Sequence, residues 1–328
     1  MRGATTFLCG IDQVTLPITT KRGERFADEY FITKDATKIG ELISAFGNGL
    51  GSVETSFLLH RAAAVIYRVG SVQLDATDSI GEVLDRQLVQ DMLRVKGLES
   101  AMWLIKDNAC HFDRAWLAFN GHGQTTVNNN FWASRKSCAD GTFRTVDFAS
   151  DELRVARGWD RPVGEHIAGA DVPTMLAKGS LRFQRFEYFI GAGRDSIDVA
   201  MKIAQYCSGL EALVSTAQQE LSHQVSERVA VLLAGSVRQR LQIYRTVKQA
   251  YGYRSKAVHG ASFKPADVNQ LRDCATEVDQ ICRDLSLLYF GPDARFRDAI
   301  ESSDQRATDF FMEALFGAVE PRPTESAK

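Results

Sequence analysis

Cysteine, net charge and long apolar runs are all scarce in this 328-residue sequence. Its six cysteines lie far apart and form no CxxC pair, which argues against a disulfide framework in a chain of this size. No run approaches the roughly 18 apolar residues of a membrane span, and the first residues lack the charged-then-apolar pattern of a signal peptide. We therefore expect a protein of the reducing cytoplasm that has no membrane partner.

Phosphate-binding and metal-binding motifs are also missing. Neither GxxxxGK[ST] nor GxGxxG occurs, and residues 191–193 (GAG) lack both the third glycine and a strand–turn–helix setting. Cys110, His111, Asp113 and His122 are grouped in the first half of the chain, but no metal-ligand spacing repeats among them. We therefore expect no cofactor and no metal.

The net charge hides a local excess of basic residues. Formal net charge is −2, from 39 Lys+Arg against 41 Asp+Glu, so the whole chain lacks the field of a typical nucleic-acid-binding protein. Between residues 222 and 264 the acid is Glu227, and the basic residues are Arg228, Arg238, Arg240, Arg245, Lys248, Arg254, Lys256 and Lys264. Such an excess is typical of a phosphate-binding surface, although a solvated helix face with few acids gives the same pattern.

The length allows two domains, and the pattern of apolar residues changes along the chain. Residues 1–170 mix helical and strand-like segments, whereas residues 176–318 are helical almost throughout. Glycine and proline are enriched over 158–173, where we place the domain boundary, and the Pro- and charge-rich residues 319–328 are expected to be disordered. The predicted fold class is α+β, a mixed α/β domain followed by an all-α helical bundle.

Within residues 1–170 two amphipathic helices are predicted. The first covers 36–46 and is ended by Gly47 and Gly49, and the second runs from Ile80 to Val95 with Thr77 and Asp78 at its cap. The apolar run 57–69 is too short for periodicity to decide, and we assign it to a strand pair.

The next segments favour strands. We predict strands over 102–105 and 115–119, then a hairpin whose turn at 139–141 joins 131–136 to 142–148. A brief helix then starts at Ser150.

Helical periodicity dominates from Leu181 onward. Apolar stripes define helices over 183–190, 197–213, 221–232, 237–251 and 268–288. Four or five such helices with short connections predict a bundle, in which Cys274 and Cys282 are packing residues. A further helical stretch, rich in phenylalanine between 296 and 316, is expected to pack on the bundle or on a partner chain.

Three motifs in this helical part resemble successive landmarks of the Apea-like branch of the HEPN domain family. They are residues 209–213 (GLEAL), 226–233 (SERVAVLL) and 251–260 (YGYRSKAVHG), and their order and spacing match as well as their identities. The third contains the Arg-x4-6-His signature of HEPN domains, as Arg254 and His259. The resemblance covers about residues 180–290, roughly a third of the chain.

The resemblance implies a ribonuclease. HEPN proteins with the intact signature cut RNA without a metal, usually as dimers, and many are bacterial toxins or antiviral effectors. Carried over, Arg254 and His259 are the catalytic pair of a homodimer that acts on single-stranded RNA or tRNA, and the amino-terminal domain answers a phage-derived or other trigger. HEPN toxins paired with nucleotidyltransferase antitoxins usually carry a tyrosine two residues after the histidine. This chain has Ala261 there, so regulation through that tyrosine is not supported.

The residue types suit this chemistry. Histidine exchanges protons near neutral pH, and arginine presents a permanently charged fork of N–H donors to a phosphate. Ser255 and Lys256 can add hydrogen bonds or charge at the same place. Arg238, Arg245 and Lys248 are expected to contact RNA.

Helix geometry limits how the pair can act. Five residues along an ideal helix leave the side chains of Arg254 and His259 roughly 140° apart, so a regular helix cannot aim both at one phosphate. Either the helix ends near Val258 with Gly260 as a left-handed terminator, or pairs from two subunits meet across a two-fold interface.

Structural interpretations of the same residues stay open. The arginine of the pair could cap carbonyls at a helix end, and the histidine could fill a polar gap. Glu211 and Arg228 are interpreted as an internal ion pair or as helix-orienting contacts that support the site. Tyr251 and Tyr253 either stack on a base or belong to the core. The alternative function is a non-catalytic HEPN-like module that binds RNA, a nucleotide or another protein.

Overall fold

The computed structural model describes residues 2–74, 79–133, 135–168, 179–217 and 219–317, and of residues 160–168 it describes the backbone alone. The predictions made for Thr77, Asp78 and residues 319–328 lie outside the described residues. The chain divides into an amino-terminal unit, residues 1–138 with 142–171, and a helical unit, residues 139–141 with 172–328. The fold is α+β, as predicted: a six-stranded antiparallel sheet lies in the first unit, and the described part of the second is mostly helical.

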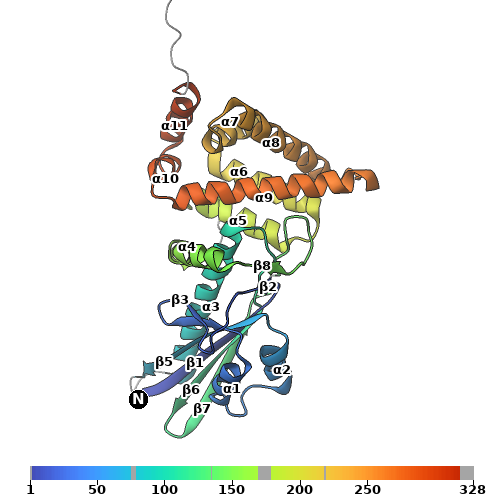
Figure 1. The fold of residues 1–328 in the computed structure, drawn as a ribbon. Helices are drawn as coiled ribbons and strands as arrows, with labels where there is room; N and C mark the ends of the chain where they lie inside the picture. The colour runs from blue at the N-terminus through green and yellow to red at the C-terminus, as the bar shows by residue number, and fades with distance from the viewer. Residues whose placement is uncertain (1, 75–78, 134, 169–178, 218, 318–328) are drawn as a thin grey trace, which may run out of the picture. The chain divides into compact units, whose positions relative to one another are not determined.

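The amino-terminal unit is built on a sheet with the strand order β3-β4-β5-β1-β6-β7 (Figure 1). Its strands are β1 (Arg2–Ile11), β3 (Glu24–Ala27), β4 (Tyr30–Thr33), β5 (Ala64–Gln73), β6 (Arg114–Gly121) and β7 (Gln124–Phe131). The two central strands, β1 and β5, pair along their whole length, from Arg2 opposite Gln73 to Ile11 opposite Ala64. A short parallel pair, β2 (Val14–Thr15) with β8 (Val146–Asp147), lies beside this sheet in the same unit.

Helices cover both faces of the sheet because successive side chains of a strand point to opposite sides. On β1, Phe7 and Cys9 belong to the core formed with α3 (Ile80–Ile105), whereas Leu8 belongs to the core formed with α1 (Ala36–Ser44) and α2 (Ser52–His60). Full burial of a side chain such as Phe7 or Leu8 contributes about 1.5–3 kcal/mol.

A buried charge pair lies on the α3 side of the sheet. Arg68 on β5 donates two hydrogen bonds to Asp91 on α3, at 2.9 and 2.7 Å. The hydroxyl of Tyr30 and the amide of Gln87 also donate to Asp91, so this fully buried carboxylate has four donors. Because these hydrogen bonds satisfy the Asp91 carboxylate, its negative charge can remain in an apolar core.

The predicted helix at 36–46 is confirmed as α1. Asp35 is its N-cap, and its carboxylate accepts a hydrogen bond of 2.7 Å from the backbone N–H of Lys38. The second predicted helix is α3, which begins after Ser79 and runs ten residues beyond Val95.

Two strand predictions are wrong for the same reason. Residues 57–60 form the end of α2, and only 64–69 of the predicted 57–69 strand pair lie in a strand, β5. Residues 102–105 are the last turn of α3, and three of them are buried. A short continuous apolar run has the same pattern in a buried helix and in a buried strand, so periodicity cannot separate them. The strand predicted at 115–119 is confirmed as part of β6.

The predicted hairpin over 131–148 is also wrong. Residues 139–141 do form a turn, with Gly141 at φ +79° and the N–H of Cys138 bonded to the carbonyl of Thr142 at 2.8 Å. The described residues of 131–136 and 142–148 are not paired with each other as strands, and β8 pairs with β2 instead. The hairpin of this region joins β6 to β7 and turns at His122 and Gly123, both in the left-handed conformation.

The helix predicted to be brief, α4, extends over Ser150–Ala168 and therefore crosses most of the expected boundary segment. Its buried residues Leu153 and Ala156 belong to the α3-side core. An exposed glycine costs a helix only about 1 kcal/mol relative to alanine, so Gly158 does not end a helix that packing supports.

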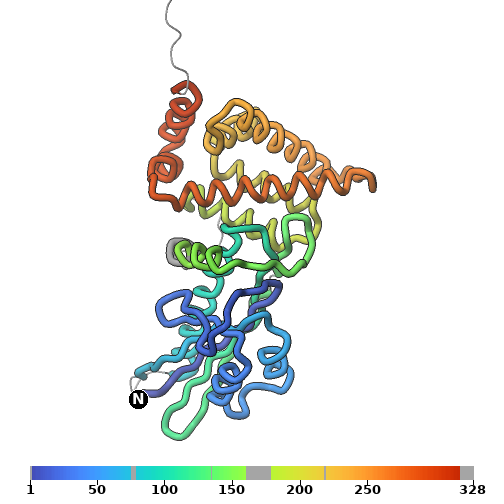
Figure 2. The backbone as a smooth tube through the Cα atoms, viewed as in Figure 1, coloured from blue at the N-terminus to red at the C-terminus, as the bar shows by residue number. Residues whose placement is uncertain are grey.

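The helical unit begins with five helices that form the predicted bundle (Figure 2). They are α5 (Arg182–Asp195), α6 (Val199–Val214), α7 (Leu221–Leu233), α8 (Val237–Val258) and α9 (Val268–Phe290), the last preceded by a 3-10 turn at Pro265–Asp267. Helix α6 packs against the other four, and α7 and α8 form an antiparallel hairpin. Most residues of the apolar stripes face this core, whereas Val237 and Leu241 at the start of α8 are exposed. Cys274 and Cys282 are buried in the core as predicted.

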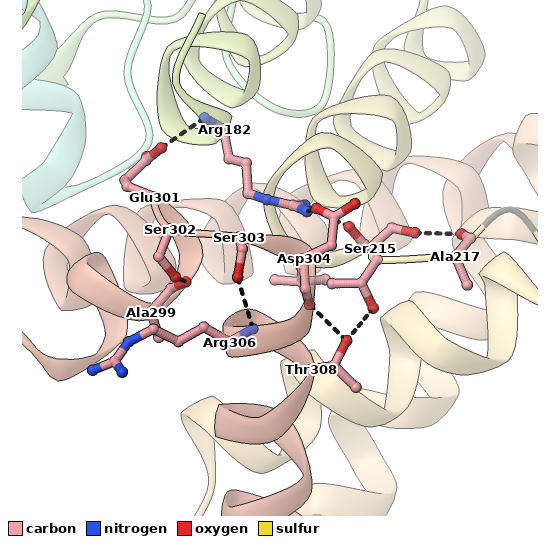
Figure 3. Close-up of polar contacts among 12 residues, drawn as sticks. Arg182, Ser215, Ala217, Ala299, Glu301, Ser302, Ser303, Asp304, Arg306 and Thr308 are labelled. Carbon is pink, nitrogen blue, oxygen red and sulfur yellow. Dashed lines mark hydrogen bonds and ion pairs between the residues drawn. The ribbon is translucent and has the colours of Figure 1, made fainter. Parts of the chain in front are cut away.

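Two shorter helices, α10 (Arg295–Ile300) and α11 (Asp304–Phe316), pack on α9 and α7 of the same bundle. Figure 3 shows the polar contacts that hold them. Glu301 accepts hydrogen bonds from the backbone N–H groups of Arg182 and Phe183, at 2.9 and 3.0 Å, and thereby caps the start of α5. The Arg182 guanidinium bonds the carbonyl of Ser215 at 2.5 Å and pairs with Asp304. The carboxy-terminal helices are thus tied to both α5 and the α6–α7 connection.

Candidate functional site

Helix α8 ends at Val258 because the backbone after it turns into a left-handed terminator. Gly260 has φ +71°, a conformation that glycine adopts without steric cost. Its N–H bonds the carbonyl of Ala257 at 3.2 Å, and the N–H of Ala261 bonds the carbonyl of Lys256 at 2.9 Å. These two bonds make a Schellman motif with His259 at the C-cap. The predicted helix end is therefore confirmed.

An open pocket of about 500 Å³ lies where this helix end faces the first turn of α7. The described residues that line it are Ser222, Lys248, Tyr251, Gly252, Arg254, Ser255, Val258 and His259. The structure thus brings together the predicted pair and two predicted helpers, Lys248 and Ser255. Lys256 is exposed near the same helix end but is not among the lining residues.

Arg254 is held in place by Glu211 on α6. Its two terminal nitrogens donate to the two carboxylate oxygens at 2.8 and 3.1 Å. The Nε–H of Arg254 is buried without a hydrogen-bond partner, and the guanidinium carbon lies 5.7 Å from the centre of the Tyr251 ring. Two of the five N–H donors of this side chain are used by Glu211 and the Nε–H is buried, which leaves two for another acceptor.

His259 is exposed, and its ring makes no hydrogen bond to any residue that the structure describes. Only its backbone takes part in the helix end, through the bond from its N–H to the carbonyl of Ser255 at 3.1 Å. The structural interpretation predicted that the imidazole fills a polar gap. It does not, because His259 is exposed. Both ring nitrogens remain open to a ligand.

The two tyrosines belong mainly to the core. Tyr251 and Tyr253 are each 8% exposed, and Tyr253 packs on Phe263 and accepts a hydrogen bond from Gln249 at 3.1 Å. The Tyr251 hydroxyl is buried without a hydrogen bond. Burial, followed by the negative charge of Glu211, raises the pKa of Tyr251 well above its ordinary range. The Tyr251 ring contributes an apolar wall to the pocket.

Arg228 lies outside this pocket and has a structural role. It is buried, donates to the carbonyl of Val214 at 2.5 Å and to the hydroxyl of Thr216 at 2.9 Å, and stacks 4.5 Å from the Phe311 ring centre. Burial, with a smaller contribution from the positive charge of Arg182, lowers the pKa of Arg228 to about 10. Of the two interpretations of Glu211 and Arg228, the mutual ion pair is wrong, because Glu211 pairs with Arg254. The other interpretation, contacts that orient helices, fits both residues, since Glu211 joins α6 to α8 and Arg228 joins α7 to the end of α6.

The basic excess of residues 222–264 is only partly available at the surface. Arg228 is buried, Arg254 is paired, and Arg240 donates to the carbonyl of Ala234 at 2.8 Å. The exposed basic residues are Arg238, Arg245, Lys248, Lys256 and Lys264. With 3.6 residues per turn, Arg245, Lys248, Gly252, Ser255 and His259 follow one face of α8.

Sequence reasoning missed Ser222, Gly252 and Val258 as pocket residues. A glycine in the interior of an otherwise regular helix is a signal that could have pointed to Gly252. Ser222 comes to the pocket through the packing of α7 on α8, 26 residues away from Lys248, and carries no local signal.

Across the described parts of the chain, no three His, Cys, Asp or Glu side chains are grouped so as to hold a metal ion. The same parts contain no helix with the length and apolar character needed to cross a bilayer. Comparisons with protein-family models, with curated proteins and with solved structures give no match for this chain.

Proposed function

We propose that this chain is a metal-independent endoribonuclease of the HEPN type, acting in the bacterial cytoplasm as a toxin or antiphage effector. Its substrate is single-stranded RNA or tRNA. The proposal rests on the three motifs between residues 209 and 260 and on one structural observation: Arg254 and His259 line the same pocket, with the imidazole unengaged and the guanidinium already oriented.

The chemistry assigns one role to each residue of the pair. His259 takes the proton of the 2′-hydroxyl as the 2′-oxygen forms a bond to phosphorus, or it gives a proton to the 5′-oxygen as the P–O5′ bond breaks. Arg254 donates its remaining N–H groups to the phosphate oxygens, where negative charge builds up in the transition state. The products are a 2′,3′-cyclic phosphate and a 5′-hydroxyl end.

A single chain supplies one copy of His259, which can perform only one of the two proton transfers. A two-fold homodimer that places two α8 ends together would supply a second copy of His259 for the other transfer. In this arrangement the amino-terminal unit restrains or directs the nuclease and answers a phage-derived or other trigger.

The test is cleavage of single-stranded RNA and of tRNA by the purified full chain in the presence of EDTA. We expect the wild type to cut and His259→Ala to lose activity at least 100-fold, since general acid–base catalysis contributes about 10²–10⁴. Because the residue is exposed and its ring makes no hydrogen bond to the described protein, the variant should melt near the wild-type temperature. Cleavage that persists in His259→Ala, or that requires an added metal, contradicts the proposal.

One observation favours the alternative, a non-catalytic module that binds RNA, a nucleotide or another protein. Glu211 holds Arg254 in a two-armed ion pair, as it would hold a purely structural arginine. Under this alternative, Arg254→Lys and His259→Ala leave the effect of the protein on bacterial growth unchanged. Loss of toxicity in His259→Ala, at unchanged levels of folded protein, favours the nuclease.

A further inference from the structure

Gly252 lies in the interior of α8, where helix stability alone would favour another residue. Its backbone is helical and exposed, and no atom lies within 4 Å of the position that a Cβ would occupy. Glycine destabilises a helix interior relative to alanine, and no neighbouring element needs the space. The open space above Gly252 is instead part of the pocket that also contains His259.

One helical turn before Gly252, the pocket has a positively charged wall. Lys248 is exposed, pairs with no described carboxylate, and donates a hydrogen bond of 2.9 Å to the hydroxyl of Ser222. Ser222 lies in the first turn of α7, and the N-cap residue Glu220 makes no side-chain capping bond there. None of the described residues lining the pocket is acidic. This wall therefore suits a negatively charged group.

The wall and the histidine are separated along the helix. Eleven residues at 1.5 Å each place Lys248 about 16 Å from His259 along the axis of α8, with Gly252 and Ser255 between them. A single phosphate cannot contact both ends. A nucleotide strand can, provided that nothing projects from α8 in the middle.

We propose that Lys248 and Ser222 bind a phosphate of the RNA strand a few nucleotides away from the cleaved bond, and that Gly252 lets the sugar–phosphate backbone lie directly against α8. This inference rests on the proposed ribonuclease function and adds to it a substrate-positioning subsite on one side of the scissile phosphate. Since the subsite contacts backbone groups and no base edge, it selects for an unpaired strand and not for a sequence.

The test measures binding separately from cleavage. The probe is a fluorescent single-stranded RNA whose 2′-hydroxyls are replaced by 2′-O-methyl groups, so that it binds without being cut, and binding is followed by anisotropy. We expect Gly252→Leu to weaken binding at least tenfold while raising the melting temperature, because leucine favours the helix. Lys248→Ala should reduce the slope of log K against log salt concentration by about 0.7, the value for one phosphate contact on a single strand.

Gly40→Leu is the matched control. Gly40 is also an exposed helical glycine with no atom within 4 Å of its Cβ position, but it lies in α1 of the amino-terminal unit. We expect Gly40→Leu to bind the probe as the wild type does. Binding by Gly252→Leu within twofold of the wild type overturns the subsite.

Two further outcomes separate the subsite from the catalytic proposal. If the wild type cuts RNA in EDTA and Gly252→Leu cuts it equally well, the ribonuclease function stands and the subsite is wrong. If the wild type does not cut RNA but Gly252→Leu loses probe binding, the subsite stands and the catalytic proposal is wrong. Displacement of the probe by 5′-AMP at the affinity of the RNA itself would show a mononucleotide site and overturn the strand-binding assignment.

Discussion

Arg254 on α8 and Glu211 on α6 form a two-armed ion pair, with N···O distances of 2.8 and 3.1 Å. The pair joins two helices whose residues are 43 positions apart, and it is partly exposed, with 31% of the arginine and 18% of the glutamate side chain accessible. It therefore has two effects that can be separated by experiment. It contributes stability, and it fixes the direction in which the guanidinium points.

Glu211→Ala should lower the free energy of unfolding by about 1–2 kcal/mol, between the values for exposed and for buried ion pairs. On the proposed function it should also slow RNA cleavage, because Arg254 is no longer oriented. Urea unfolding and an EDTA cleavage assay measure the two effects. Glu41→Ala, which breaks an exposed pair with Lys21 far along the chain, should leave both quantities nearly unchanged. Full cleavage activity in Glu211→Ala would count against an orienting role.

Gly260→Ala should lower stability by about 1–2 kcal/mol, because alanine at φ +71° is strained. Gly252→Ala, in the same helix, should raise stability by up to about 1 kcal/mol, because its backbone is helical and nothing fills the space. The two substitutions, eight residues apart, should therefore change the melting temperature in opposite directions, which two thermal melts can measure. A change in the same direction for both would mean that α8 does not end at Val258.

Asp91→Ala should be among the most damaging single changes in the amino-terminal unit. It leaves Arg68 buried without its partner, and removal of one member of a buried pair costs about 3–5 kcal/mol. Calorimetry of the full chain should show a lower melting transition for this variant. The double variant Arg68→Leu with Asp91→Leu should recover much of the loss, since it removes both charges; a double variant as unstable as Asp91→Ala would contradict the assignment.

Tyr251→Phe tests the buried hydroxyl beside Glu211. The folded pKa of Tyr251 is raised above its unfolded value of about 10, so the unfolded chain loses this proton first and stability falls as the pH rises above about 10. The phenylalanine variant should be at least as stable as the wild type at pH 7, because the removed hydroxyl has no partner. Its unfolding midpoint should fall less steeply between pH 10 and 11, and an unchanged slope would show that Tyr251 is not the group responsible.

Local signals predicted the parts of the fold that local forces decide. The Asp35 cap and the glycine terminator at Gly260 are set by hydrogen bonds within a few residues, and both could be predicted from residue type and position. The helical conformation of residues 102–105 could not be predicted, since their apolar side chains fit a buried strand equally well. Only the structure shows that α3 continues through them.

The candidate site divides in the same way. The positions of Arg254 and His259 at the end of one helix followed from their spacing and from Gly260. The partner of Arg254 could not be predicted from the sequence. Glu211 pairs with Arg254 and not with Arg228 because of how α6 packs against α7 and α8. The contribution of Ser222 likewise depends on packing between two helices and on no pattern within either of them.

The contacts drawn in Figure 3 also set the order in which the helical unit can be completed. Glu301 and Asp304 contact Arg182 across 119 and 122 residues, and Thr308 contacts Thr216 across 92. During synthesis the whole of α8 leaves the ribosome before any of these three residues, so the α6–α7 connection gains its last supports only when the final helices emerge. On the proposed nuclease function, this order would leave the connection that leads into Ser222 without these contacts until the chain is almost finished.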